Sequence, residues 1–138
     1  MLQRLTNALD FNAQALTLRA ERQRVIASNI ANADTPGYQA REMDFPRALR
    51  VATGMAKGET RMAATQPGHM ATGVRGGVGA STLGFAAAAQ TNLDGNGVDM
   101  DRERASFAEN AVKYEATLRF INGQVRSTLD AMKSPSQG

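Results

Sequence analysis

Two long segments with heptad-spaced apolar residues, one at each end of the chain, constrain its fold most strongly. In the first thirty residues, positions of one face recur at alternating intervals of four and three, with one polar interruption: Leu9, Ala13, Leu16, Ala20, Gln23, Ala27 and Ile30. This spacing keeps side chains on one side of an α-helix and is typical of a coiled-coil seam. We therefore expect one long N-terminal helix.

In the second segment, residues 99–133, apolar residues recur at the same heptad spacing. Its seam positions are Met100, Phe107, Ala111, Tyr114, Leu118, Ile121, Val125 and Met132. Asp99 is a favourable N-cap, and Asp101 and Glu103 place negative charge at the positive end of the helix dipole. Pro135 marks the end of the helix. The C-terminal segment is thus predicted to be a helix of similar length.

Each predicted helix carries a second apolar face. It consists of Phe11, Ala15, Leu18 and Val25 in the first helix and of Val112, Ala116 and Phe120 in the second. A surface helix on a small domain needs only one such face, so the second predicts a further contact, within the chain or with a neighbouring copy. Large apolar side chains are scarce, with five Phe, two Tyr and no Trp. Partners are therefore expected to supply part of the burial.

The two helices are joined by a connector rich in glycine and alanine. The sequence Asp34-Thr35-Pro36-Gly37 predicts a turn just after the first helix, with Gly37 at positive φ. Ten of the thirteen glycines lie in residues 46–98, which show little periodicity. We expect a mainly α fold: two long terminal helices pair as a coiled coil, and an irregular connector, with room for a short β-hairpin, joins them. The chain is thus divided into the N-terminal helix (1–34), the turn and extended connector (35–98), and the C-terminal helix with a short polar tail (99–138).

Composition excludes several classes of function. Without cysteine the chain has no disulfides, thiol catalysis or cysteine-ligated zinc. His69 is the one histidine, and its Gly/Thr/Met-rich surroundings predict a solvated loop rather than a catalytic or metal site. Sixteen basic and thirteen acidic residues are spread along the chain, without the basic stripe of nucleic-acid-binding proteins. No catalytic residue, metal, cofactor or nucleic-acid partner is predicted.

The N-terminal residues lack a basic region followed by an unbroken apolar run. No Sec signal peptide or transmembrane helix is therefore predicted, and we expect no direct insertion into a membrane. A route other than general secretion is needed if the protein acts outside the cytoplasm.

Two alternative functions have some support in the residues. Residues 92–103 resemble a calcium loop with Asn92, Asp94, Asn96 and Glu103 at positions one, three, five and twelve, although Asp99 stands where an apolar residue is usual. This pattern leaves open a calcium-binding helical module. A cytoplasmic helical adaptor whose connector binds a partner is the other alternative. The glycines at 73, 76, 77 and 79 are followed by no Gly-Lys-Ser/Thr and do not predict a nucleotide site.

The most specific motif follows the first helix. Ser28-Asn29-Ile30-Ala31-Asn32 is followed by Thr35-Pro36-Gly37-Tyr38, and Arg41-Glu42-Met43-Asp44-Phe45 comes next. Near the other end stand Asp94-Gly95-Asn96-Gly97-Val98-Asp99 and Lys113-Tyr114-Glu115-Ala116. These motifs resemble those of the bacterial flagellar axial proteins, which form the rod, hook and hook-associated parts, and within them the FlgB type of basal-body rod protein.

The resemblance implies a non-enzymatic structural subunit of the proximal rod, assembling through its terminal helices into a helical tube that transmits torque from the membrane ring to the distal rod. It implies a periplasmic location and export by the flagellar type III apparatus without a cleaved signal peptide. The implied partners are other rod proteins, copies of the chain itself, the MS-ring and the rod-base adaptor. The expected assembly motif comprises Ser28, Asn29, Asn32, Thr35, Pro36, Gly37 and Tyr38. The expected helix seam comprises Leu9, Leu16, Ile30, Phe107, Tyr114, Leu118, Ile121 and Val125.

Overall fold

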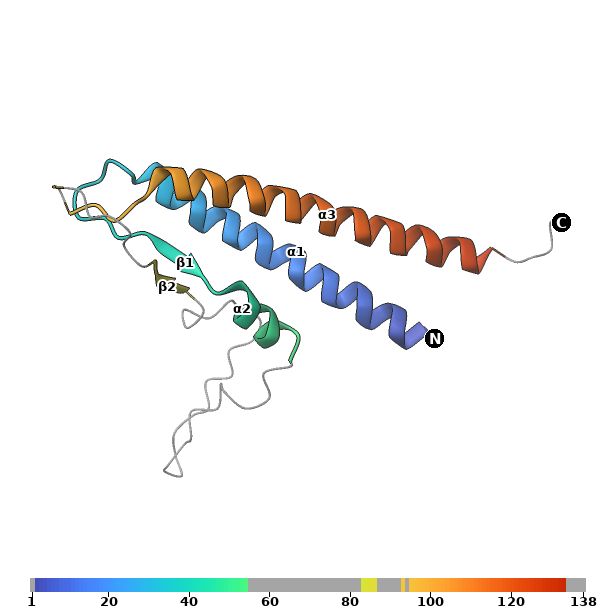
Figure 1. Cartoon of the computed structure of the whole chain (residues 1–138). Coiled ribbons are helices and arrows are strands. Elements are labelled where there is room, and N and C mark those ends of the chain that lie inside the picture. Colours follow the sequence, from blue (N-terminus) through green and yellow to red (C-terminus); the bar gives the residue numbers. More distant parts are fainter. Residues whose placement is uncertain (1, 55–82, 87–92, 94, 134–138) are drawn as a thin grey trace, which may run out of the picture.

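Two long antiparallel helices dominate the computed structural model, which describes residues 2–54, 83–86, 93 and 95–133. Helix α1 (Leu2–Ala31) and helix α3 (Met100–Met132) lie side by side, with the start of α1 and the end of α3 at the same end of the molecule (Figure 1). The predicted mainly α fold, with long terminal helices joined by a linker, is confirmed.

The helices begin and end close to the predicted positions. They contain 30 and 33 residues, and at 1.5 Å per residue they are roughly 45 and 50 Å long. The Asp99 side chain accepts hydrogen bonds from the backbone N–H groups of Asp101 and Arg102, as expected for an N-cap. In the described part of the chain, no helix combines the length and the apolar content that crossing a membrane requires.

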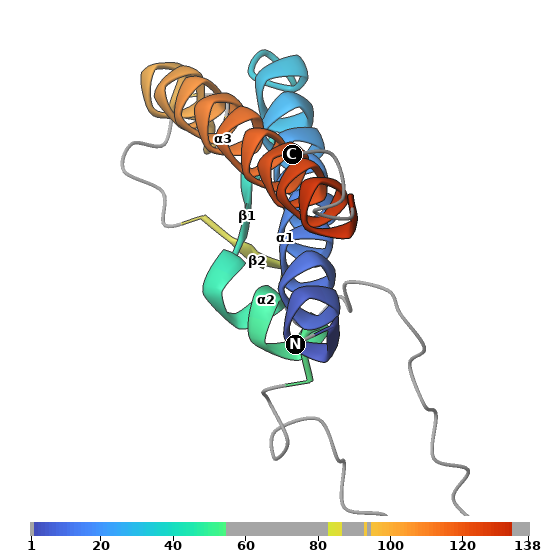
Figure 2. The ribbon, with the colours of Figure 1, turned by 90° about the vertical axis from the view of Figure 1, so that its right-hand side faces the viewer.

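Three short elements lie against one side of α1: strand β1 (Arg41–Met43), helix α2 (Phe45–Ala52) and strand β2 (Leu83–Phe85) (Figures 1 and 2). The strands pair antiparallel, with Glu42 opposite Gly84. In place of a local hairpin, they are separated in sequence by α2 and the residues after it. Helix α2 was not predicted. Its N-cap is Asp44, whose carboxylate accepts from the N–H of Arg47 at 3.1 Å.

The apolar core is small and lies between α1 and these short elements. Its buried members are Leu18, Met43 and Ala48, with Phe45, Leu49 and Leu83 packed against them. The largest side chains with almost no exposure are instead three asparagines: Asn29, Asn96 and Asn110. Since a buried amide is costly unless it forms hydrogen bonds, these three positions show where the fold is specified by polar contacts.

Candidate assembly site

The end of α1 is closed by the side chain of Asn32. Its Nδ2 donates to the carbonyl of Ser28 at 2.8 Å, and its backbone N–H donates to the same carbonyl at 3.1 Å. The Thr35 hydroxyl then donates to Asn32 Oδ1 at 3.2 Å. The Asn32 amide thus gives the Ser28 carbonyl a second donor at the end of the helix, and its Oδ1 ties Thr35 of the following turn to that end.

The turn after α1 has the geometry that the sequence predicts. Gly37 has φ of +72°, and the N–H of Tyr38 donates to the carbonyl of Thr35 at 3.2 Å. Proline followed by a residue at positive φ is characteristic of a type II turn. Pro36 and Gly37 are exposed, so they act through backbone geometry and not through packing.

Asn29 fastens the returning chain to α1. Its Nδ2 donates to the carbonyl of Arg41 at 2.8 Å, and its Oδ1 accepts from the N–H of Arg41 at 3.0 Å. The Tyr38 hydroxyl donates to the same Oδ1 at 3.1 Å and lies 3.4 Å from the hydroxyl of Ser28. The amide therefore pairs with β1 much as a neighbouring strand would, on the edge that β2 does not occupy.

Asn96 joins the second motif to the first. Its Nδ2 donates to the carbonyls of Asn32 and Thr35, at 3.0 and 2.7 Å, and its Oδ1 accepts from the N–H of Val98 at 2.9 Å. The N–H of Gly97 donates to the carbonyl of Tyr38 at 2.9 Å. Two sequence motifs about sixty residues apart thus form one junction, which we call the Asn96 clamp. Its residues are Asn32, Thr35, Tyr38, Asn96 and Gly97.

The clamp also bears on the calcium alternative. The amide of Asn96 is engaged with backbone groups instead of being free as an oxygen ligand. Asn92 and Asp94, which that alternative requires, lie outside the described residues, as do His69 and the glycines at 73, 76, 77 and 79. Within the described ranges, no three His, Cys, Asp or Glu side chains are grouped as metal ligands.

A ladder of polar contacts joins α1 to α3. Asn12 Nδ2 donates to Gln124 Oε1 at 3.0 Å, and Arg19 Nε donates to Thr117 Oγ1 at 3.2 Å. Asn110 Nδ2 donates to two acceptors on α1, the carbonyl of Arg19 at 2.9 Å and Gln23 Oε1 at 2.6 Å.

The ladder was not predicted, although its residues on α3 recur every seven positions at Asn110, Thr117 and Gln124. The predicted seam consists of apolar residues and does not include this polar period. Asn110 Oδ1 is the buried side-chain atom without a hydrogen-bond partner in the described part of the chain. A single polar residue in a helix seam is a known means of specifying register at some cost in stability.

Arg19, on α1, contacts both α3 and α2. Besides its contacts with α3, its guanidinium lies 4.5 Å from the centroid of the Phe45 ring on α2, a cation–π distance. Desolvation, together with repulsion from Arg22, lowers the pKa of Arg19 below its usual value. An arginine remains charged after such a shift, so it brings a cation into the partly buried interface.

The structure does not bring the predicted seam residues together into a buried core within one chain. On α1, Leu9, Leu16 and Ile30 are half-buried, whereas Ala15, Leu18 and Ile26 are fully buried. On α3, Ile121 is half-buried, and the others are 37–40% exposed: Phe107, Tyr114, Leu118 and Val125. In the single chain, α1 therefore faces α3 largely through the polar ladder, and much of the apolar side of α3 is left uncovered.

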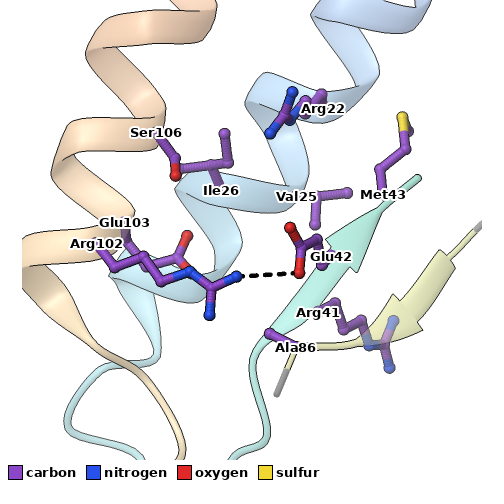
Figure 3. Close-up of a pocket in the computed structure, with 10 residues that line it drawn as sticks. All are labelled: Arg22, Val25, Ile26, Arg41, Glu42, Met43, Ala86, Arg102, Glu103 and Ser106. Atoms are coloured by element: carbon purple, nitrogen blue, oxygen red, sulfur yellow. Dashed lines mark hydrogen bonds and ion pairs between the residues drawn. The ribbon is translucent and has the colours of Figure 1, made fainter. Parts of the chain in front are cut away.

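A small crevice forms where β1 meets both long helices (Figure 3). It holds about 20 Å³, roughly the space of one water molecule. The Arg102–Glu42 ion pair, at 3.2 Å, closes one side, and both side chains are about half exposed. Such a pair contributes little to stability. The lining residues are Arg22, Val25, Ile26, Arg41, Glu42, Met43, Ala86, Arg102, Glu103 and Ser106. This crevice is too small to hold a substrate.

The comparisons with known proteins agree with these motifs. The family model described as "Flagella basal body rod protein" matches residues 9–39, which include the end of α1 and the Pro36-Gly37 turn. The FlgB rod protein of Proteus mirabilis (strain HI4320) is 42% identical over 96% of this chain and 98% of its own length. That of Escherichia coli K12 is also 42% identical, over 97% of this chain and 99% of its own. The chain belongs to the FlgB family of flagellar basal body rod proteins.

As a FlgB-family protein, the chain is a structural subunit of the flagellar basal-body rod. The FlgB protein of Salmonella typhimurium (strain LT2), 40% identical over 96% of this chain and 98% of its own, shows the same relationship. The calcium-binding and adaptor alternatives receive no support from these relatives. The similarity extends over nearly the full length, so it includes α3 and the clamp as well as the N-terminal motif.

Proposed function

We propose that this chain forms part of the wall of a helical rod in the periplasm by packing the exposed apolar faces of α3, together with α1, against neighbouring subunits. The observation that carries this proposal is the number of large apolar side chains that the single chain leaves exposed on α3. They are Phe107, Val112, Tyr114, Leu118, Phe120, Val125, Leu129 and Met132. These side chains lie on two faces of α3, one with Phe107, Tyr114, Leu118 and Val125 and the other with Val112 and Phe120. Exposed apolar surface of this kind marks an interaction site, and head-to-tail contacts between unlike faces build helical assemblies.

Two apolar grooves between the long helices support the same proposal. One runs beside Leu5, Ala116 and Phe120, and the other beside Ala20, Ala27 and Tyr114. Grooves on one subunit and exposed apolar side chains on another can interdigitate as packed helices do. The partners that we propose are copies of the chain, other rod proteins, the MS-ring and the rod-base adaptor.

The junction between the end of α1 and the start of α3 has a different role in this proposal. The Asn96 clamp and Asn29 hold β1 and the turn before it against the end of α1. A subunit that transmits torque needs such a rigid connection between its helical core and its outer part. The chain carries no proposed catalytic function, metal or cofactor.

We further propose that the chain is exported unfolded by the flagellar type III apparatus, without cleavage of a signal peptide. The small apolar core supports this proposal, because little buried surface opposes unfolding before export. The intact mass of the chain extracted from basal bodies tests it. A mass that lacks an N-terminal segment would contradict the absence of cleavage.

The assembly proposal is tested by Leu118→Asp in a strain that lacks the chromosomal gene. Leu118 is 39% exposed in the single chain, so the charge can be solvated there, but it would be buried against a neighbour. The matched control is Ala108→Asp, which is exposed on the charged side of α3 between Arg104 and Glu115.

Both variants should be secreted, and the control should restore motility. Only Leu118→Asp should be missing from purified basal bodies. Intact rods and normal swimming with Leu118→Asp would show that this face of α3 is not an assembly surface.

A further inference from the structure

Asn96 combines a chemically reactive sequence with complete burial. Asparagine is followed by glycine at only two places in this chain, Asn96-Gly97 and Asn122-Gly123. Asparagine is a labile residue, and a following glycine, which has no Cβ, leaves its own backbone nitrogen unhindered beside the side-chain amide. Asn96 is 0% exposed. The most reactive type of asparagine therefore stands at the centre of the clamp.

We propose that Asn96 is a site of spontaneous deamidation that is blocked when the clamp is formed and open when the chain is unfolded. In the reaction, the Gly97 nitrogen attacks Cγ of Asn96, and a new C–N bond closes a five-membered imide. The bond from Cγ to Nδ2 breaks, and ammonia leaves with the proton from the Gly97 nitrogen. Water then opens the imide to give aspartate or isoaspartate at position 96. No oxidant, reductant or enzyme is required.

The folded geometry opposes each step of this reaction. The attacking nitrogen is engaged, because the Gly97 N–H donates to the carbonyl of Tyr38 at 2.9 Å. The amide under attack is held by its two donations, to Asn32 and Thr35, and by the acceptance from Val98. Full burial excludes the water that must open the imide. Deamidation therefore requires the clamp to open first, and its rate reports how often that happens.

The product cannot rebuild the clamp. A carboxylate at position 96 has no N–H to donate, and it would face the carbonyl oxygens of Asn32 and Thr35, now 3.0 and 2.7 Å from Nδ2. Oxygen would oppose oxygen in a buried site, and a charge there is costly. If the chain waits unfolded before export, which rests on the proposed function, waiting gradually produces subunits that cannot close the junction.

The second Asn-Gly pair is an internal reference. Asn122 is exposed and lies within α3, where the backbone nitrogen of Gly123 is held by the hydrogen bonds of the helix and not by the clamp. In an unfolded chain both pairs should react at similar rates. In the folded chain each reports on its own element, so loss of the clamp alone should expose Asn96 and not Asn122.

The test incubates the purified full-length chain in buffer and in concentrated urea at one pH and temperature, and measures deamidation of each peptide by mass spectrometry. In urea, both peptides should deamidate. In buffer, Asn96 should react at least about tenfold more slowly, which corresponds to ~1.4 kcal/mol for opening the clamp. The Asn96 peptide taken from isolated basal bodies should be largely intact.

Two variants make the result specific. Gly97→Ala should slow the reaction of Asn96 in urea and leave that of Asn122 unchanged. It should still fold, because the added Cβ would lie 2.9 Å from Gln39 Oε1, the far end of an exposed, flexible side chain that can move away by giving up its hydrogen bond to the Gly95 carbonyl. Asn96→Asp, which mimics the product, should lose hydrogen-exchange protection at the Gly97 amide, whereas Asn122→Asp should keep it.

Equal rates for Asn96 in buffer and urea would overturn the proposal, as would the absence of reaction in urea. Normal protection of Gly97 in Asn96→Asp would show that the product still closes the clamp and would overturn that part. These readouts use purified protein, so they stand or fall independently of whether α3 is the assembly surface.

Discussion

Replacing Asn29 by leucine and, separately, Asn110 by leucine is expected to change the free energy of unfolding in opposite directions. Both asparagines are 1% exposed, and each lies within a long helix, Asn29 in α1 and Asn110 in α3. They differ in what their amides satisfy. The comparison therefore isolates the energetic consequence of hydrogen-bond partners at constant burial.

Asn29→Leu removes the donation to the Arg41 carbonyl and the acceptance from the Arg41 N–H and the Tyr38 hydroxyl. Each such bond contributes about 1 kcal/mol net, and a buried backbone group left unpaired costs a further 1–3 kcal/mol or so. Leucine recovers about 2 kcal/mol by apolar burial at most, and its shape does not match the amide. Because both the N–H and the C=O of Arg41 lose their partner, the expected loss is about 3 kcal/mol or more.

Asn110→Leu removes two bonds, to the Arg19 carbonyl and to Gln23 Oε1. The carbonyl keeps its helical partner within α1, and Gln23 is only half-buried and can reach water. The substitution also removes Oδ1, which is buried without a partner. About 2 kcal/mol of lost bonds is set against about 2 kcal/mol from leucine burial and 1–3 kcal/mol from the removed orphan acceptor. The expected result is a gain of about 1–3 kcal/mol.

The assay is urea unfolding followed by circular dichroism, with the midpoint as readout and the slope as a check that compactness is unchanged. The midpoint should fall for Asn29→Leu and rise for Asn110→Leu. Sedimentation of Asn110→Leu should reveal additional oligomers, because the polar residue that specifies how the helices pair is gone. If both substitutions lower the midpoint equally, burial alone governs these sites and the reasoning from partners is refuted.

Three further substitutions test the turn, the helix and an exposed ion pair. Gly37→Val should lower stability by about 1 kcal/mol or more, because φ is +72° there, whereas Gly123→Ala should raise it by about 1 kcal/mol within a helix; urea midpoints that move together would contradict this. Lys113→Ala should raise the pKa of Glu109, now lowered chiefly by its hydrogen bond to Lys113, toward its ordinary value in an NMR titration. A carboxyl group whose pKa is lowered by folding stabilises the folded state at pH values above its ordinary pKa. That stabilisation is lost as the pH falls through the lowered pKa. The variant should lack this dependence, and an unshifted titration would disprove the pairing.

The sequence alone determined the parts of this protein that depend on neighbouring residues. The two long helices follow from their apolar period, the start of α3 from Asp99, and the positive φ of Gly37 from the proline before it. Local geometry decides each of these, because a helix period or a turn type involves only residues a few positions apart. The motifs around residues 28–38 and 94–99 also carried the family resemblance.

Helix α2 shows where local reasoning stopped short. Its eight residues begin at an acceptable N-cap, but the surrounding glycine-rich composition predicted an irregular connector. An isolated helix of this length is marginal in water. It is stable here because Ala48 and Leu49 pack on Leu18 of α1 and on Met43. The strand pair likewise depends on residues far apart in sequence.

The faces that meet in the folded chain were decided only by the tertiary structure. Periodicity placed Leu118 and Val125 on a seam, but it cannot distinguish a face that packs within the chain from one that packs against a neighbour, because both require apolar residues at the same spacing. The antiparallel placement of α1 against α3 aligned Asn12, Arg19 and Gln23 with a polar period instead. Likewise, the side chain of Asn96 finds its partners only when a turn about sixty residues earlier is brought beside it. Such contacts are set by the packing of whole helices: the spacing of Asn110, Thr117 and Gln124 places them on one face of α3, but it does not say which residues they meet.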